Sequence, residues 1–199
     1  MRCRRRPPVS DSHTAAIILA AGASRRLGEP KQLVRLNGET LLARAIRTAG
    51  EAGCSPILVV LGAQHEHILS ACHLGDAIPV INDRWQEGMA TSIVVGVHAL
   101  QSRPEGMAGT ILMVCDQPAV TPTHLRALID TKTLTASSYA GRKGVPAWFP
   151  AVAFPQLSEL TGDTGARDLI RNAPAVSLAD GELDIDTTAE RTEAEQRFG

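Results

Sequence analysis

A loop that combines small and cationic residues follows the first apolar run of the chain. Ala20, Ala21 and Gly22 lie at the start of this loop, and Arg25 and Lys31 follow a few positions further along. Small residues let backbone N–H groups approach a ligand closely, and fixed positive charges hold phosphate oxygens. The loop therefore indicates a triphosphate site, although its spacing matches neither the P-loop nor the G-x-G-x-x-G fingerprint. A plain surface turn is the alternative interpretation.

A second candidate for chemistry is Asp116, which comes just after the apolar residues 110–114 and precedes the stiff dipeptide Gln117-Pro118. This position would place its carboxylate at the carboxyl edge of a sheet. Mg²⁺ keeps several waters and takes only one or two protein oxygens, which a carboxylate at such an edge can supply. A helix N-cap or an ordinary loop acid is the alternative interpretation.

Strand-like and helix-like patterns alternate along the chain up to residue 133. Short apolar runs predict buried strands at residues 15–20, 57–61, 78–81 and 110–114. Apolar residues at helical spacing predict helices at residues 39–53, 66–71, 89–101 and 121–133. This alternation predicts an α/β, Rossmann-like fold with a mainly parallel sheet and helices on both faces. Ligands of such sheets bind beyond the carboxyl ends of the strands.

The remainder of the chain has a different texture. Residues 137–155 are short and punctuated by proline and glycine, which predicts a small antiparallel extension of the sheet. We further expect a helix, a short strand and a closing polar helix at residues 164–172, 175–178 and 188–198.

The composition of the 199 residues excludes several classes of protein. Hydrophobic residues make up 44% of the chain and charged residues 21%, which is ordinary for a globular protein. The formal net charge of −1 offers nothing to attract a nucleic acid, and no apolar run approaches the roughly 18 residues of a membrane span. The cysteines form no C-x-x-C pair, so we expect neither a disulfide framework nor a structural zinc site.

The N-terminal segment, residues 1–13, is basic, but the apolar stretch of a secretion signal does not follow it. We expect it to be a disordered tail, with a polyanion-binding arm as the alternative. Residues 14–199 then form a single domain, since this length suits one compact unit. Because neither a secretion signal nor a membrane-spanning run is apparent, we expect a cytoplasmic protein.

Five motifs in order along the chain resemble those of the molybdenum cofactor cytidylyltransferase branch of the nucleotidyltransferases. Residues 19–33, LAAGASRRLGEPKQL, are similar to the signature loop L-A-[AG]-G-x-[SG]-x-R-x-G-x-x-K. The other four resemble W-x-x-G-x-x-x-S, C-D-Q-P, G-D-x-G-A-R and D-I-D-T, at residues 85–92, 115–118, 162–167 and 184–187. The Ala20-Ala21 pair and the K-Q-L ending resemble the cytidylyl branch more than the guanylyl branch, which usually has L-A-G-G.

The resemblance implies a nucleotide-diphospho-sugar transferase-like fold and a role for each matching residue. It implies that Arg25, Lys31 and Asp116 are catalytic and that Asp116 and Asp186 bind Mg²⁺. Because Arg26 is adjacent to Arg25, its side chain should point elsewhere, and we expect it to be a surface charge. The implied nucleotide-binding residues are Leu19, Ala20, Ala21, Gly22, Ser24, Arg25, Lys31, Gly88 and Ser92. The implied acceptor-binding residues are Trp85, Gln117, Pro146, Gly162, Asp163 and Arg167.

Several of these residues have simpler interpretations. Asp186 could cap a helix, Ser92 could be a solvated helix serine, and Trp85 could pack in the core. The chain also departs from the branch at two places. Val145 occupies the position of a histidine, and T-A-E follows D-I-D-T where P-E-D is frequent.

The implied reaction transfers CMP from CTP to the terminal phosphate of a molybdopterin-type acceptor and releases pyrophosphate. The implied partners are CTP, this acceptor, and a molybdoenzyme or its chaperone, with neither nucleic acid nor membrane. Three alternatives remain. The chain could be a guanylyltransferase on the same cofactor, a cytidylyltransferase on a sugar or polyol phosphate, or a non-catalytic nucleotide-binding or cofactor-carrying chaperone.

Overall fold

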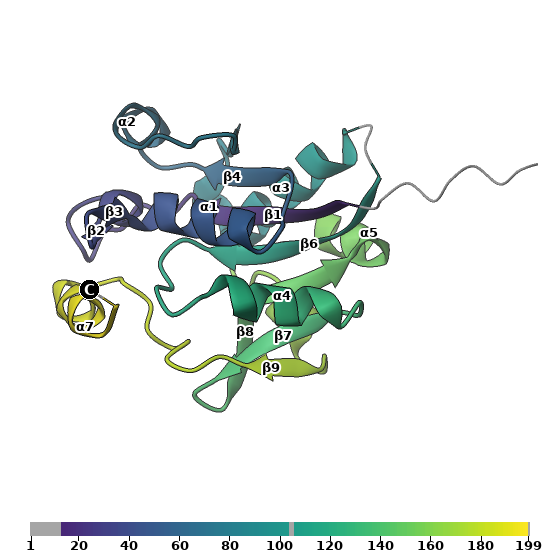
Figure 1. Cartoon of the computed structure of the whole chain (residues 1–199). Helices are drawn as coiled ribbons and strands as arrows, with labels where there is room; N and C mark the ends of the chain where they lie inside the picture. The colour runs from purple at the N-terminus through teal and green to yellow at the C-terminus, as the bar shows by residue number, and fades with distance from the viewer. Residues whose placement is uncertain (1–12, 104–105, 199) are drawn as a thin grey trace, which may run out of the picture.

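The computed structural model describes residues 13–103 and 106–198, which form a seven-stranded sheet covered by helices (Figure 1). The strand order is β5-β4-β1-β6-β8-β7-β9, and four of the six neighbouring pairs are parallel. The strands are β1 (His13–Ala20), β4 (Ile57–Leu61), β5 (Ile78–Ile81), β6 (Met107–Val114), β7 (Thr135–Tyr139), β8 (Arg142–Pro150) and β9 (Ala175–Ser177). Because β8 runs antiparallel to both β6 and β7, it forms the predicted antiparallel extension.

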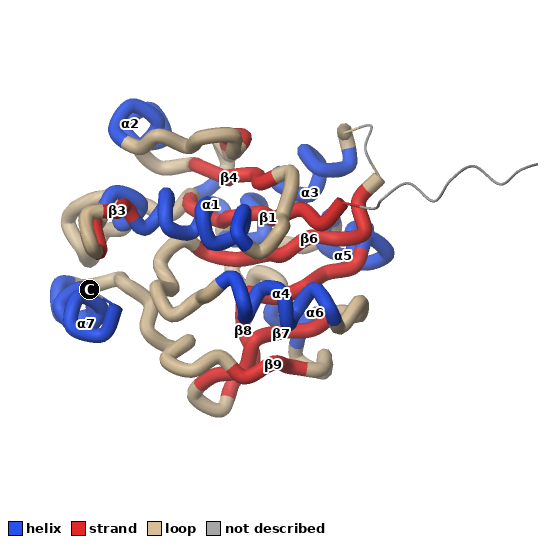
Figure 2. The backbone as a smooth tube through the Cα atoms, viewed as in Figure 1, coloured by secondary structure: helices blue, strands red, loops and turns tan. Residues whose placement is uncertain are grey.

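The helices pack on both faces of this sheet, as Figure 2 shows by colour. The side chains of β1 alternate between the faces, so Ile18 packs with α1 and α4, while Ile17 packs with α3 and α5. The helices are α1 (Leu41–Glu51), α2 (His65–Ala71), α3 (Met89–Gln101), α4 (Pro122–Asp130), α5 (Phe154–Ser158), α6 (Arg167–Ile170) and α7 (Thr188–Phe198). Three short 3-10 turns lie at Lys31–Leu33, Trp85–Glu87 and Ala151–Ala153.

A small hairpin precedes α1, where the sequence predicted helix from residue 39. Strands β2 (Arg35–Leu36) and β3 (Glu39–Thr40) pair across Asn37-Gly38, whose φ angles of 52° and 78° suit a two-residue turn. Helix α1 then starts at Leu41, because the Thr40 hydroxyl accepts a hydrogen bond from the Ala43 N–H. The hairpin shares a third apolar cluster with α7, so the C-terminal helix lies beside it.

Other differences from the predicted elements are small. Within residues 164–172 only α6 is helical, and α5 was not predicted. Strand β6 begins at Met107, ahead of the predicted residue 110, and pairs with His13 at the start of β1. Of the predicted basic tail, residues 1–13, only His13 is among the described residues, and it begins β1. No helix in the described part of the chain is long and apolar enough to span a membrane.

Candidate active site

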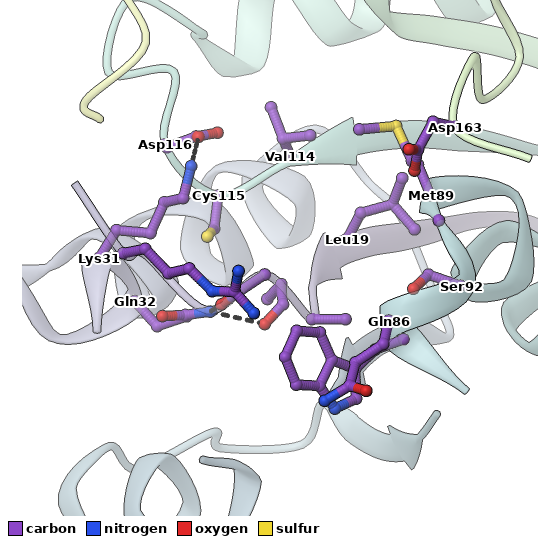
Figure 3. A pocket seen from close by; sticks show the side chains of 16 residues that line it. Leu19, Lys31, Gln32, Gln86, Met89, Ser92, Val114, Cys115, Asp116 and Asp163 are labelled. Carbon is purple, nitrogen blue, oxygen red and sulfur yellow. Dashed lines mark hydrogen bonds and ion pairs between the residues drawn. The ribbon is translucent and has the colours of Figure 1, made fainter. Parts of the chain in front are cut away.

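A pocket of about 560 Å³ lies at the carboxyl ends of β1 and β6, and we call it the first pocket. Figure 3 shows Lys31 and Gln32 on one side of it and Gln86, Met89 and Ser92 on the other. All but one of the residues predicted to bind the nucleotide line this pocket: Leu19, Ala20, Ala21, Gly22, Arg25, Lys31, Gly88 and Ser92. The fold therefore brings together segments that are far apart in the sequence.

The remaining residue of that predicted set, Ser24, lies in a smaller adjoining cleft of about 280 Å³ with Arg25 and Arg26. Its hydroxyl accepts a hydrogen bond from the backbone N–H of Lys31 at 3.0 Å. This bond closes the loop upon itself, so that the cations at its two ends face the same space.

Gln32 holds the small-residue loop in place, a role that the sequence did not reveal. Its side chain is only 1% exposed, and Nε2 donates to the carbonyl oxygens of Ala20 at 2.6 Å and Gly22 at 3.3 Å. A buried amide that spans these two carbonyls fixes the backbone where a ligand would approach it. The K-Q-L ending of the motif was the available signal.

Asn82 positions Ser92 on the opposite wall of the pocket. Asn82 is also 1% exposed, and its Nδ2 donates to the hydroxyls of Thr91 and Ser92, each at 2.9 Å. Its Oδ1 accepts from the backbone N–H of Arg84, just before the 3-10 turn, so Asn82 ties the end of β5 both to this turn and, through Thr91 and Ser92, to the start of α3. Ser92 is thus a buried, hydrogen-bonded residue of the pocket wall, and not a solvated helix serine.

The 162–163 loop comes unusually close to Gly88. A Cβ atom at Gly88 would lie 2.5 Å from Asp163 Oδ1 and 2.6 Å from the Gly162 carbonyl oxygen. This carbonyl also accepts a hydrogen bond from the Ala90 N–H at 3.1 Å. Since Asp163 and Trp85 line the first pocket, the structure places both beside the predicted nucleotide-binding residues.

A second pocket of about 530 Å³ adjoins the first, and the two share Lys31, Met89, Val114 and Asp116. Of the residues predicted to bind the acceptor, Gln117 and Arg167 line this second pocket. Pro146 lines neither pocket, because it is buried within β8 and its carbonyl accepts from the Ser137 hydroxyl. The sequence did not single out three further residues of the second pocket: Tyr139, Arg142 and Asp184.

A chain of four charged side chains lies where the pockets meet. The Lys31 ammonium donates to the carboxylates of both Asp116 and Asp186, the latter at 2.6 Å. Arg26 donates to the other oxygen of Asp186, also at 2.6 Å, so it is more than an isolated surface charge. Burial alone would lower the pKa of Lys31, but the charge of Asp116 and the hydrogen bonds to both carboxylates raise it. Lys31 is therefore a cation at neutral pH.

The segment before α7 presents Asp186 to this chain of charges. The Thr187 hydroxyl accepts from the Glu190 N–H, and the Glu190 carboxylate accepts from the Asp186 N–H and the Thr187 hydroxyl. This is a variant of the capping box in which the Glu190 carboxylate reaches the N–H of the residue before the N-cap, and it fixes the backbone of Asp186. Glu190 thus anchors the helix start in a chain that lacks P-E-D at this point. The capping residue is Thr187, which leaves the Asp186 carboxylate free for Lys31 and Arg26.

The two aspartates also have the chemistry of a divalent-metal site. Their carboxylates converge on one ammonium, and Asp116 Oδ1 is buried without a hydrogen-bond partner among the described residues. Two carboxylate oxygens with waters and phosphates suit Mg²⁺ or a similar hard cation. Nowhere do the described residues gather three or more His, Cys, Asp or Glu side chains into a metal cluster.

The strand order and the small-residue loop at the end of β1 are those of a nucleotide-binding α/β transferase. The MobA-like NTP transferase domain matches residues 16–178, and the chain belongs to this family. A nucleotidyl transferase from Methanothermobacter shares the fold, with a TM-score of 0.79, 22% identity and coverage of 94% of this chain and 97% of that one. The predicted fold class is confirmed.

Several relatives are similar over most of the chain. The purine catabolism protein PucB of Bacillus subtilis is 33% identical over 87% of this chain and 92% of its own length. The nicotine blue oxidoreductase of Paenarthrobacter nicotinovorans is 31% identical over 79% and 81%, respectively. The crystal structure of Rv0371c from Mycobacterium tuberculosis has a TM-score of 0.81 with 30% identity, covering 93% of this chain and 98% of that one.

Two further likenesses concern a metal and a substrate. Rv0371C has also been solved in complex with manganese, with a TM-score of 0.76, 27% identity and coverage of 93% and 99%. A 53-residue stretch is 45% identical to a probable molybdenum cofactor guanylyltransferase of Opitutus terrae, which covers 27% of this chain and 26% of that protein.

Proposed function

We propose that the protein transfers CMP from CTP to the terminal phosphate of a molybdopterin-type acceptor and releases pyrophosphate. The observation that carries this proposal is the junction of two pockets at Lys31 and Asp116. A transferase needs two substrates to meet at one point, and here the meeting point carries the charges that phosphates require. Membership of the family supports the nucleotide, and the guanylyltransferase-like stretch supports the molybdenum cofactor.

The reaction requires one new P–O bond and the loss of another. An oxygen of the acceptor phosphate attacks the α-phosphorus of CTP, and the bond to the β-phosphate oxygen breaks. The electron pair leaves with pyrophosphate. Because the attacking oxygen is already anionic, no general base is needed, and catalysis depends on orientation and charge stabilisation.

Arg25 and Lys31 are the residues that would hold the triphosphate. Both line the first pocket and the small cleft beside it, and Arg25 has no ion-pair partner within the described residues. A guanidinium can hold two phosphate oxygens at once, whereas the ammonium is a compact point charge. The Lys31 ammonium pairs with both carboxylates, so a phosphate that enters the pocket competes with them for the same ammonium.

Asp116 and Asp186 are the residues that would hold a divalent cation, which we propose to be Mg²⁺. When bound, such an ion neutralises phosphate charge and stabilises the transition state. The manganese complex of the mycobacterial relative supports a divalent ion in a protein of this fold. The buried, unpartnered Oδ1 of Asp116 supports it independently.

The choice of CTP rests on the walls of the first pocket. The side chains of Ala20 and Ala21 narrow the pocket from one wall, and the Ser92 hydroxyl lies on the opposite wall. Cytosine presents an exocyclic amine and a ring carbonyl, which a hydroxyl and backbone groups can satisfy. Guanine is larger and has a different donor order, so it would leave buried groups unpaired, at a cost of about 1–3 kcal/mol each.

A competition assay with CTP, GTP, Mg²⁺ and molybdopterin tests this proposal by following pyrophosphate release and the product. We expect CTP to exceed GTP by at least about tenfold in kcat/KM, and Ala21→Gly to narrow the difference. A preference for GTP would overturn the cytidylyl assignment in favour of the guanylyl one. Transfer to a sugar or polyol phosphate alone would overturn the acceptor, and binding without pyrophosphate release would favour the carrier alternative.

A further inference from the structure

Gln117 lines the second pocket, and its neighbours determine the orientation of its side-chain amide. The Tyr139 hydroxyl donates to the Val145 carbonyl at 3.1 Å, so it can only accept from Gln117 Nε2, which lies 3.3 Å away. The same Nε2 donates to the Gly181 carbonyl at 3.1 Å. Gln117 Oε1 is consequently the free end of the amide, and it is buried without a partner among the described residues.

Asp184 presents a second unpaired oxygen to the same pocket. Its Oδ1 is buried and has no hydrogen-bond partner among the described residues, although the carboxylate as a whole accepts a hydrogen bond from the Gln117 side chain, which partly offsets the rise in its pKa that burial causes. The backbone beside it is firmly held, because the Ile185 N–H donates to the Asp116 carbonyl at 3.1 Å. A buried acceptor without a donor destabilises the folded chain, and a ligand N–H that donates to it would remove this cost.

The cations nearby do not satisfy these two oxygens. The Lys143 ammonium donates hydrogen bonds to the carbonyl oxygens of Arg171 and Ala173, at 3.2 and 2.6 Å. Arg142 lies over the Tyr139 ring, with 5.2 Å between the guanidinium carbon and the ring centroid. The described ion pairs include none to Asp184.

We propose that Gln117 and Asp184 form a subsite for the edge of a flat heterocycle that carries adjacent N–H donors. The 2-amino-4-oxopyrimidine edge of a pterin has this pattern, with an exocyclic amine beside a ring N–H. A carboxylate and an amide carbonyl can only accept, so they favour such an edge and repel one that presents carbonyl oxygens. This subsite rests on the proposed function, in which the phosphate end of the acceptor lies at Lys31 and Asp116.

Two small fluorescent probes test the subsite without any nucleotide transfer. Pterin carries the 2-amino group, and lumazine carries a 2-oxo group at the same place on the same ring system. Titration of the full chain with each probe gives two dissociation constants. We expect pterin to bind at least about tenfold more tightly than lumazine, a difference of about 1.4 kcal/mol.

Asp184→Asn should reduce this preference to less than about threefold, because the asparagine side chain places an N–H donor where the carboxylate oxygen faced the 2-amino group of pterin. Asp168→Asn is the matched control, since Asp168 is exposed, pairs with Arg171 and lines no part of the pocket. Circular dichroism verifies the fold of both variants, and the wild-type comparison of the probes needs no variant at all.

The subsite is refuted by equal affinity for the two probes, by failure of both to bind, or by an unchanged preference in a folded Asp184→Asn variant. These results are independent of the transfer assay. A chain that prefers pterin but releases no pyrophosphate from CTP would retain the subsite and refute the proposed reaction. Transfer without probe discrimination would do the opposite.

Discussion

Lys31 Nζ lies 2.6 Å from Oδ1 of Asp186, although 155 positions separate the two residues in the sequence. The same ammonium donates to Asp116, so one cation joins the loop after β1, the end of β6 and the segment before α7. Arg26 supports Asp186 from the solvent side. Lys31 is therefore the cation that the two aspartates share.

Asp116→Ala should abolish turnover and cause a modest loss of stability. Asp116 is the buried carboxylate at the end of β6, and without it Lys31 still has Asp186 as a partner. We expect pyrophosphate release from CTP with Mg²⁺ and acceptor to fall by far more than about tenfold, which corresponds to about 1.4 kcal/mol. Urea unfolding should show a loss of about 1–3 kcal/mol. Asp130→Ala, at the exposed end of α4, is the control. Activity within tenfold of wild type would rule out the catalytic role.

Arg25→Ala and Lys31→Ala should both weaken CTP-dependent activity, and Arg26→Ala should do so much less. Arg25 and Lys31 line the first pocket, whereas the Arg26 side chain is 72% exposed and contacts Asp186. Steady-state kinetics with CTP as the varied substrate gives the comparison. We expect losses in kcat/KM above about tenfold for the first two variants and a few-fold for the third. Equal losses for Arg25 and Arg26 would mean that the register of this loop is misassigned.

Gly88→Ala and Gly22→Ala should separate stability from ligand binding. Gly88 has a φ of 114°, and a Cβ there would collide with Asp163 and Gly162, so the variant should lose about 1–3 kcal/mol of stability. At Gly22 a Cβ would meet no atom within 4 Å, so this variant should fold normally. The added methyl group would nevertheless enter the first pocket and weaken CTP binding. Thermal unfolding with and without CTP measures both effects, and an unimpaired Gly88→Ala protein would contradict the strain argument.

Asp184 should make stability depend on pH in a known direction. Burial, together with the charge of Asp116, raises the pKa of this carboxyl from 3.8 to about 6. Between these values the folded state binds more protons than the unfolded state, so this group's contribution to stability falls as pH rises through the window. Above about pH 6 the penalty is fully present. Asp184→Asn should therefore raise the midpoint of thermal unfolding relative to wild type at about pH 8, and not below about pH 4. A difference that stays constant with pH would contradict this.

Long periodic segments were predictable from the sequence because their pattern repeats over many residues. The buried run of β1 and the helical spacing of α3 are such segments. The β2–β3 hairpin has strands of two residues each, and α5 and α6 are only slightly longer than one helical turn. Elements of this length have no periodicity to detect, so tertiary packing decides them.

The site shows the same division. Arg25, Lys31 and Asp116 follow strand ends, and the topology of a parallel sheet brings such loops together. Gln32 and Asn82 could not be found in this way, because their roles depend on which carbonyl or hydroxyl lies opposite them in space. The sequence also did not reveal that Trp85 and Asp163 line the first pocket. For Asp163 this depends on how closely residues 162–163 approach Gly88 in space.

The wall that the two pockets share has a consequence for the end of the reaction. Under the proposed chemistry, the product joins the occupants of both pockets across Lys31 and Asp116. When one end of this molecule dissociates, the other end keeps it near its pocket at a high effective concentration, so the free end rebinds. Either substrate alone lacks this second attachment. We therefore expect the finished dinucleotide to dissociate more slowly than either substrate, so that the protein retains its product after the reaction.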